Sequence, residues 1–217
     1  VAFVLESAGY RVIEAEDGAQ GLDRATATSV DLVITDQNMP NMDGLTLVRS
    51  LRELRDYKTT PILLVCEEAH RYVPSEKNAD GSSVGRILSR IAKEGRKYGI
   101  SLGLITQRPS DLAEGVLSQC GTIISMRLNN ERDQAFVKAA MPEGARGFLD
   151  SIPALRNREC IVCGEGVSIP MRVSFDELEE IKRPASEDPS FSQLWTNSGG
   201  EEEMVMRTVQ RWRAQGR

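Results

Sequence analysis

Three short and almost uninterrupted apolar runs constrain this chain most strongly, and each of them is followed by polar residues. They are Asp31–Asp36, Pro61–Val65 and Ser101–Thr106. Such runs are typical of strands that are buried on both faces of a parallel sheet. Helical patterns separate the runs, and strands that alternate with helices predict an α/β fold. The sequence therefore predicts a doubly wound parallel sheet in which Ile62–Val65 lies between the other two strands.

Further elements are expected on both sides of these strands. A helix should end at Gly9, a strand should follow at Arg11–Ala15, and a helix should begin at Asp17. Other segments predict helices at 45–55, 86–99, 110–120, 130–140 and 142–152, a strand at 122–128, and a β-hairpin over 159–175 that turns at Gly164–Gly166. From Asp176 the chain is rich in Pro, Ser, Gly and acids, which predicts a flexible tail with a short terminal helix at 204–215.

Composition excludes several classes of protein. The 217 residues include only four cysteines, no run of 18 apolar residues and no signal-peptide pattern, so we expect a cytoplasmic chain without a membrane span. The net charge of −5 is spread unevenly. Residues 66–175 carry 15 Lys and Arg against 13 Asp and Glu, whereas the segments before and after are acidic. Any surface that faces a polyanion is therefore expected in the middle of the chain.

The first 65 residues resemble a response-regulator receiver (CheY-like) domain, most clearly in DLVITDQNMPNMDGLTLVRSLRE. The resemblance implies that Asp36, at the end of a strand, accepts a phosphoryl group from a histidine kinase. A carboxylate at the carboxyl edge of a parallel sheet lies where ligands bind in such folds. Two family features are missing, however. The chain begins after the strand that would supply the acidic pair for Mg²⁺, and Gln107–Pro109 stands where the family has a Lys.

From about Pro61 to Phe175 the chain resembles the C-terminal half of HerA-type ATPases, which are hexameric DNA-translocating motors related to FtsK. Three segments carry this resemblance: ILLVCEEAHRYVP, SRIAKEGRKYGISLGLITQRPSDL and SQCGTIISMRLNNERDQ. The resemblance implies a Walker B strand, a role in DNA translocation, and a homo-hexamer or a nuclease as partner. ATP and Mg²⁺ are the implied cofactors.

The same resemblance assigns roles to individual residues. Glu67 is implied to associate with Mg²⁺, and Glu68 to polarise the attacking water. Gln107 is implied to sense the γ-phosphate. Arg96 is implied to be an arginine finger that reaches the neighbouring subunit, and Arg108 is a second candidate for phosphate contact. His70, the only histidine, lies beside the two acids and has either a coupling or a structural role.

No phosphate-binding loop accompanies these residues. Such a loop needs a Gly-Lys-Ser/Thr sequence, which occurs nowhere in the chain, and Gly81–Arg86 has the wrong spacing and no Lys. The chain thus has half of each active site, with the join within Pro61–Val65. We therefore expect a truncated receiver-like segment at 1–65, an ATPase segment at 66–175 and a tail at 176–217.

These features predict the remnant of a DNA-translocating ATPase that is inactive as the isolated chain. Two alternatives remain: a phosphorelay protein phosphorylated on Asp36, and a structural chimera without activity. A natural recombinant, a designed fusion and a misassembled fragment are all compatible with the sequence. Because the first residue is Val, we expect the chain to start inside a longer gene.

Overall fold

The protein is described by a computed structural model that covers residues 1–75 and 83–177. Its contacts divide the chain into two units, Val1–Phe175 and Asp176–Arg217. The expected tail and the expected terminal helix lie outside the described residues. The boundary expected between residues 65 and 66 stays a prediction, because no separate unit begins there.

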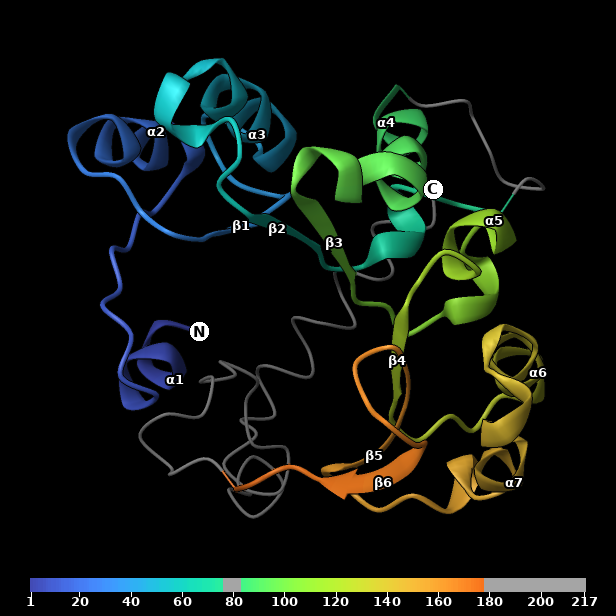
Figure 1. Ribbon diagram of the computed structural model, residues 1–217. Coiled ribbons are helices and arrows are strands. Elements are labelled where there is room, and N and C mark those ends of the chain that lie inside the picture. Colours follow the sequence, from blue (N-terminus) through green and yellow to red (C-terminus); the bar gives the residue numbers. More distant parts are fainter. Residues whose placement is uncertain (76–82, 178–217) are drawn as a thin grey trace, which may run out of the picture. The chain divides into compact units, whose positions relative to one another are not determined.

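A three-stranded parallel sheet forms the centre of the first half of the chain (Figure 1). Its strands are β1 (Val33–Asp36), β2 (Ile62–Cys66) and β3 (Ile100–Leu104). β2 lies in the middle, and in the register of the sheet Leu64 is opposite both Thr35 and Leu102. The prediction that Ile62–Val65 is flanked by the other two apolar runs is therefore confirmed, and so is the α/β class.

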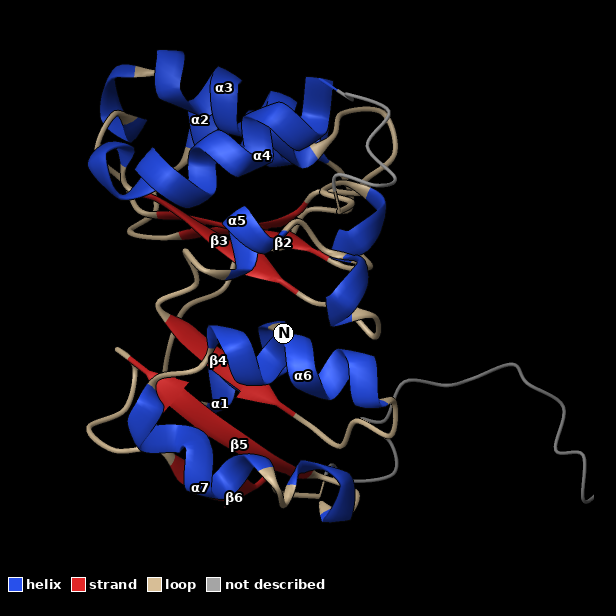
Figure 2. Ribbon diagram, turned by 90° about the vertical axis from the view of Figure 1, so that its right-hand side faces the viewer, coloured by secondary structure: helices blue, strands red, loops and turns tan. Residues whose placement is uncertain are grey.

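Helices cover one face of this sheet (Figure 2). They are α2 (Gly18–Ala27), α3 (Gly44–Glu53) and α4 (Ser83–Glu94). Along β2, side chains are alternately buried and half-buried, and buried Leu64 packs with Leu45 of α3 and Leu88 of α4. The opposite face is less covered, since Ile34 of β1 is 37% exposed. Only β2 has one fully buried face, whereas burial on both faces was expected for all three strands from their apolar sequence.

The helix starts follow ordinary capping chemistry. Asp17 accepts a hydrogen bond from the backbone N–H of Gln20, and Asp43 accepts one from Thr46, so each aspartate caps the helix that follows it. The short helix α1 (Ala2–Ser7) is followed by Gly9 at φ +88°, where the expected helix end lies.

The strand expected at Arg11–Ala15 is wrong. These residues form no ladder with any strand, and most of them are exposed. An alternating segment becomes a strand only when a neighbour satisfies its backbone groups, and β1 has β2 as its only partner in the sheet.

Contacts at the amino end of the sheet join the receiver-like and ATPase-like sequences. Arg52 of α3 donates one guanidinium hydrogen bond to the carbonyl of Tyr57 and another, 3.2 Å long, to that of Gly99. The carbonyl of Gly99 also accepts a hydrogen bond from the backbone N–H of Ile62. Gly99 has φ +64°, a conformation that glycine adopts without strain. The two sequences are therefore packed as one sheet with shared cores.

A second, antiparallel sheet follows. It consists of β4 (Thr122–Ser125), β5 (Glu159–Gly164) and β6 (Met171–Ser174), in that order. The pair β5–β6 is the expected hairpin, although its connection spans residues 165–170. The strand expected at 122–128 is shorter than predicted and pairs with β5.

Helices accompany this second sheet. The helix expected at 130–140 is α6 (Glu131–Ala140). In place of the helices expected at 110–120 and 142–152, the chain forms shorter helical segments. These are η5 (Pro109–Asp111), α5 (Glu114–Leu117), η6 (Glu143–Ala145), α7 (Arg146–Leu149) and η7 (Ile152–Ala154).

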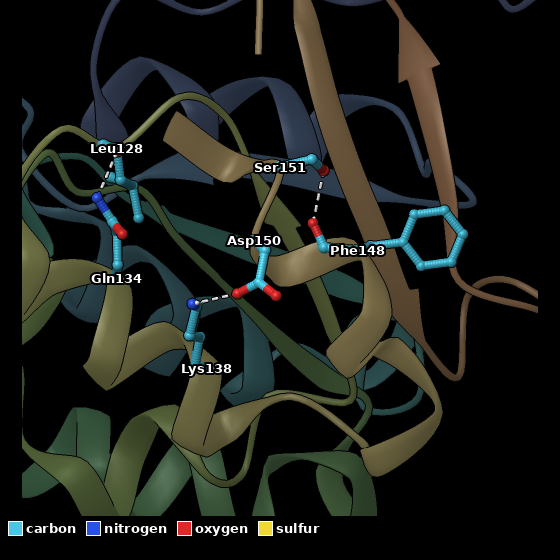
Figure 3. A network of polar contacts seen from close by, with 6 residues as sticks. All are labelled: Leu128, Gln134, Lys138, Phe148, Asp150 and Ser151. Carbon is cyan, nitrogen blue, oxygen red and sulfur yellow. Dashed lines mark hydrogen bonds and ion pairs between the residues drawn. The ribbon is translucent and has the colours of Figure 1, made fainter. Parts of the chain in front are cut away.

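Polar contacts connect α6 with the segment after α7 (Figure 3). Lys138 pairs with Asp150 at 3.0 Å, and the side-chain amide of Gln134 donates to the carbonyl of Leu128. The hydroxyl of Ser151 donates to the carbonyl of Phe148.

Among the described residues, no helix combines the length and the apolar character that crossing a membrane requires.

Candidate active-site edge

The carboxyl ends of the three parallel strands bring most of the expected site residues to one edge of the sheet. Asp36 is the last residue of β1, Glu67 and Glu68 follow β2, and Gln107 comes three residues after the end of β3. Adjacent parallel strands place their ends side by side, so these residues come from neighbouring loops. We call this group the carboxyl edge. The strand order thus places Asp36, Glu67 and Gln107 at one edge, and the roles expected for these residues stay predictions.

Glu68 is held in an unusual backbone conformation. Its φ is +50°, in the left-handed region that residues other than Gly and Asn rarely adopt. The next residue, Ala69, is fully buried and donates its backbone N–H to the carbonyl of Ile105 at 2.9 Å. Ile105 in turn donates to the carbonyl of Cys66. These bonds fix the main chain on both sides of Glu68, and strained residues of this kind are concentrated at functional sites.

More bonds connect the loop after β2 with the loop after β3. The backbone N–H of Ser75 donates to Asp111, and that of Ala113 donates to Val73. The carboxylate of Asp133, 7% exposed, accepts a hydrogen bond from the backbone N–H of Ser110. The sequence analysis missed Asp133, and its position in the first turn of a predicted helix gave no sign of a contact 23 residues away.

A polar network connects the loop after β2 with the loop after β3 through His70 and Thr106. His70 Nδ1 is 3.0 Å from the hydroxyl of Thr106, and His70 Nε2 is 3.6 Å from a carboxylate oxygen of Glu68. The backbone N–H of Arg108 also donates to the Thr106 hydroxyl. The sequence analysis noticed His70 but not Thr106, because a single Thr at a strand end carries no signal of its own.

The remaining candidates differ in position. Glu67, Gln107 and Arg108 are exposed at the carboxyl edge. Arg96 is also exposed, but it lies in η4 (Gly95–Tyr98), which precedes β3. A strand of five residues is roughly 16 Å long. Arg96 is therefore at the opposite end of β3 from Gln107.

Asp36 is near the same edge but in a different environment. Its Oδ1 is buried, and no hydrogen-bond partner for it exists among the described residues. The neighbouring Gln37 is held by two hydrogen bonds. Its backbone N–H donates to the carbonyl of Val65, and its side-chain oxygen accepts from the backbone N–H of Leu45. A Cβ at Gly44 would collide with the carbonyl of Asp36, so only glycine permits this approach of α3 to β1.

The charge of Asp36 reaches the loop that follows β2. Burial, and secondly the Asp36 carboxylate, raise the pKa of the Cys66 thiol to about 12. Burial and then Asp36 also raise the pKa of Tyr72. The receiver-like acid therefore acts electrostatically on residues of the ATPase-like segment.

The carboxyl edge fits the implied cofactors unequally. Among the described residues, no group of three or more His, Cys, Asp and Glu is arranged to hold a metal. Mg²⁺ is usually held by one or two carboxylates together with phosphate oxygens, so Glu67 fits an ion that arrives with phosphates. For the phosphates themselves, the sequence contains no Gly-Lys-Ser/Thr of the kind with which a phosphate-binding loop ends.

Comparison with known proteins finds two different relatives. Residues 1–80 match the response regulator receiver domain family. Over 45 residues, 21% of the chain, the protein is 58% identical to the sensor protein EvgS of Escherichia coli, of which 4% is covered. Over 125 residues, 58% of the chain, it is 38% identical to the DNA double-strand break repair helicase HerA of Pyrococcus furiosus.

Only 22% of that HerA protein is covered, so the chain spans about a quarter of the helicase relatives it matches. Among solved structures, the genome packaging NTPase B204 of Sulfolobus turreted icosahedral virus 2 has a similar fold. The TM-score is 0.52 with 15% identity, and 73% of this chain and 88% of B204 are covered. The chain therefore combines a receiver-like N-terminal segment and a HerA-like helicase segment in one α/β fold.

Proposed function

We propose that residues 61–175 are the water-polarising half of a HerA-type ATPase that translocates DNA. The observation that supports this most is the placement of Glu67, Glu68 and Gln107 at the ends of adjacent parallel strands. Their loops are joined by backbone hydrogen bonds, so the three side chains are presented as one unit. Similarity to a HerA helicase over 125 residues, 58% of the chain, supports the assignment.

Each residue then has a distinct task. The Glu68 carboxylate accepts a hydrogen bond from a water molecule and thereby makes its oxygen a better nucleophile. Glu67 holds Mg²⁺, which supplies positive charge for the phosphate oxygens when it is bound. Gln107 and Arg108 face the terminal phosphate. Arg96, at the other end of β3, serves the site of a neighbouring copy in a homo-hexamer.

The isolated chain is proposed to be inactive. Water can be polarised at the carboxyl edge, but phosphates must be held by a loop that these 217 residues do not include. The four cysteines are free, which fits a reducing cytoplasm.

A transplant tests this proposal. Residues 61–175 replace the matching segment of the Pyrococcus furiosus HerA protein, which keeps its own remaining sequence. We expect DNA-dependent ATP hydrolysis that falls at least about 100-fold in Glu68→Gln, as loss of a group that activates water does. Glu114→Gln, an exposed acid outside the carboxyl edge, is the matched control and should keep full activity. A correctly assembled transplant in which both variants are equally active would refute the role of Glu68.

Phosphorylation of Asp36 by a histidine kinase is a second candidate. It is favoured by the position of Asp36 at the end of β1 and by the receiver match. The acidic pair and the Lys that neutralise phosphoryl oxygens are missing, so phosphorylation by acetyl phosphate with Mg²⁺ should be undetectable by mass spectrometry. Stoichiometric modification that disappears in Asp36→Ala would instead support the phosphorelay function.

A further inference from the structure

The single histidine bridges two loops of the carboxyl edge. Its Nδ1 is 3.0 Å from Thr106 Oγ1 in the loop after β3, and its Nε2 is 3.6 Å from Glu68 Oε2 in the loop after β2. The His70 side chain is 16% exposed, whereas that of Glu68 is 41% exposed. The ring is therefore the more enclosed partner, and it approaches a carboxylate that is open to water on its other side.

The two contacts of the ring together favour one of its neutral forms. The backbone N–H of Arg108 donates to Thr106 Oγ1 at 3.0 Å, and the hydroxyl keeps its own hydrogen to donate to an acceptor. His70 Nδ1, 3.0 Å away, can be that acceptor when it carries no hydrogen. A neutral imidazole has one N–H, and if Nδ1 accepts, the hydrogen is on Nε2 and faces the Glu68 carboxylate. The other tautomer would direct a lone pair at a negative charge.

We propose that His70 is a positioning residue that orients the Glu68 carboxylate as an Nε2–H donor, with its tautomer set by Thr106. The tautomer and the contacts of His70 do not depend on a catalytic role. Their importance for the polarisation of water rests on the proposed function. Because Thr106 also receives the Arg108 N–H, a shift of the loop that bears Gln107 and Arg108 changes the donor that holds Glu68. The contacts of Thr106 and His70 therefore connect the phosphate-facing loop with Glu68, the acid that activates water.

The backbone supports this arrangement. Glu68 is fixed at φ +50° and Ala69 is bonded to Ile105, so the main chain cannot swing the carboxylate away from the ring. Only the Glu68 side chain retains freedom, and the His70 N–H restricts it. A neighbouring donor that fixes a reactive group in this way lowers the cost of orienting it during the reaction.

The full chain with ¹⁵N-labelled histidine offers a direct test, since its only imidazole gives one set of ring signals. Long-range ¹H–¹⁵N spectra are recorded in alkaline buffer, in which an imidazole is uncharged. We expect the Nε2–H tautomer in the wild type. In Thr106→Val the Nδ1–H share should rise about fivefold, the effect of losing one ordinary hydrogen bond. Thr106→Ser, which retains the hydroxyl, should restore the wild-type ratio.

Variants of the two adjacent acids complete the test. Glu68→Ala should change the tautomer ratio and speed exchange of the Nε2 hydrogen with water, whereas Glu67→Ala, the exposed neighbour, should change neither. A wild-type ring that is mainly Nδ1–H, or a ratio that is the same in Thr106→Val, would overturn the proposal. No nucleotide is needed, so the outcome is independent of whether the ATPase proposal survives.

Discussion

Two acids at the same sheet edge, Asp36 of the receiver-like segment and Glu68 of the ATPase-like segment, differ in the contacts that surround their carboxylates. Glu68 is followed by a buried alanine bonded to β3, and its carboxylate lies beside His70. Asp36 has a buried oxygen without a partner among the described residues. Both acids follow strands of one sheet, so the difference arises from their side-chain surroundings and not from the topology.

β2 unites the cores of the two segments, because buried Leu64 packs with Leu45 of α3 and Leu88 of α4. Around Glu68, the loops after β2 and β3 are bonded to each other. Around Asp36, the described residues supply no hydrogen-bond partner for the buried oxygen. A shared strand can thus unite two cores without completing both sites.

The largest expected effect concerns that shared strand. Leu64 is fully buried between α3 and α4, so Leu64→Ala should lower the free energy of unfolding by about 3 kcal/mol. Ile34→Ala, on the open face of β1, should cost less than about 1 kcal/mol. Urea denaturation followed by circular dichroism measures both values. Equal losses would mean that β2 is not the common core of the two segments.

A smaller effect should distinguish two aspartates of the receiver-like motif. Asp43→Ala removes a helix cap and should destabilise the protein by about 1 kcal/mol. Asp36→Ala removes an oxygen that is buried without a partner, so it should stabilise the protein by about 1 kcal/mol. The same denaturation measurements decide the sign. Destabilisation by Asp36→Ala would reveal a partner for this carboxylate.

The smallest effect is on Cys66. The Cys66 thiol has a pKa of about 12, raised first by burial and secondly by the Asp36 carboxylate. Asp36→Asn removes that negative charge, so it should lower the pKa of Cys66 but keep it above the ordinary value of 9.0. Alkylation rates against pH, resolved by mass spectrometry, measure this. The pKa of Cys120 is raised by burial alone and should not respond to the substitution. An unchanged pKa of Cys66 would mean that the Asp36 charge does not act on this thiol.

The same pKa has a consequence for stability. The folded state retains the Cys66 proton up to a higher pH than the unfolded chain does, so it binds more protons between about pH 9 and pH 12. This contribution to stability is complete below that range and is lost as the pH rises through it. In the variant Cys66→Ala the loss should be smaller over the same range.

The sequence predicted the parallel sheet, the central place of β2 and the start of a helix at Asp17, because these depend on local pattern and on strand adjacency. It failed at Arg11–Ala15, where the alternation is correct but no neighbouring strand is present. The carboxyl edge was predictable for the same reason as the sheet. The contacts of Thr106 and Asp133 were not, since both connect loops that are distant in sequence.

This chain is proposed to present the acids of an ATPase without a place for the phosphates. Calorimetric titration of the full chain with Mg-ATP tests it most directly. We predict no saturable binding up to millimolar nucleotide and no hydrolysis. Saturable binding tighter than roughly 100 µM, about −5.5 kcal/mol, together with turnover that is lost in Glu68→Gln, would contradict the account.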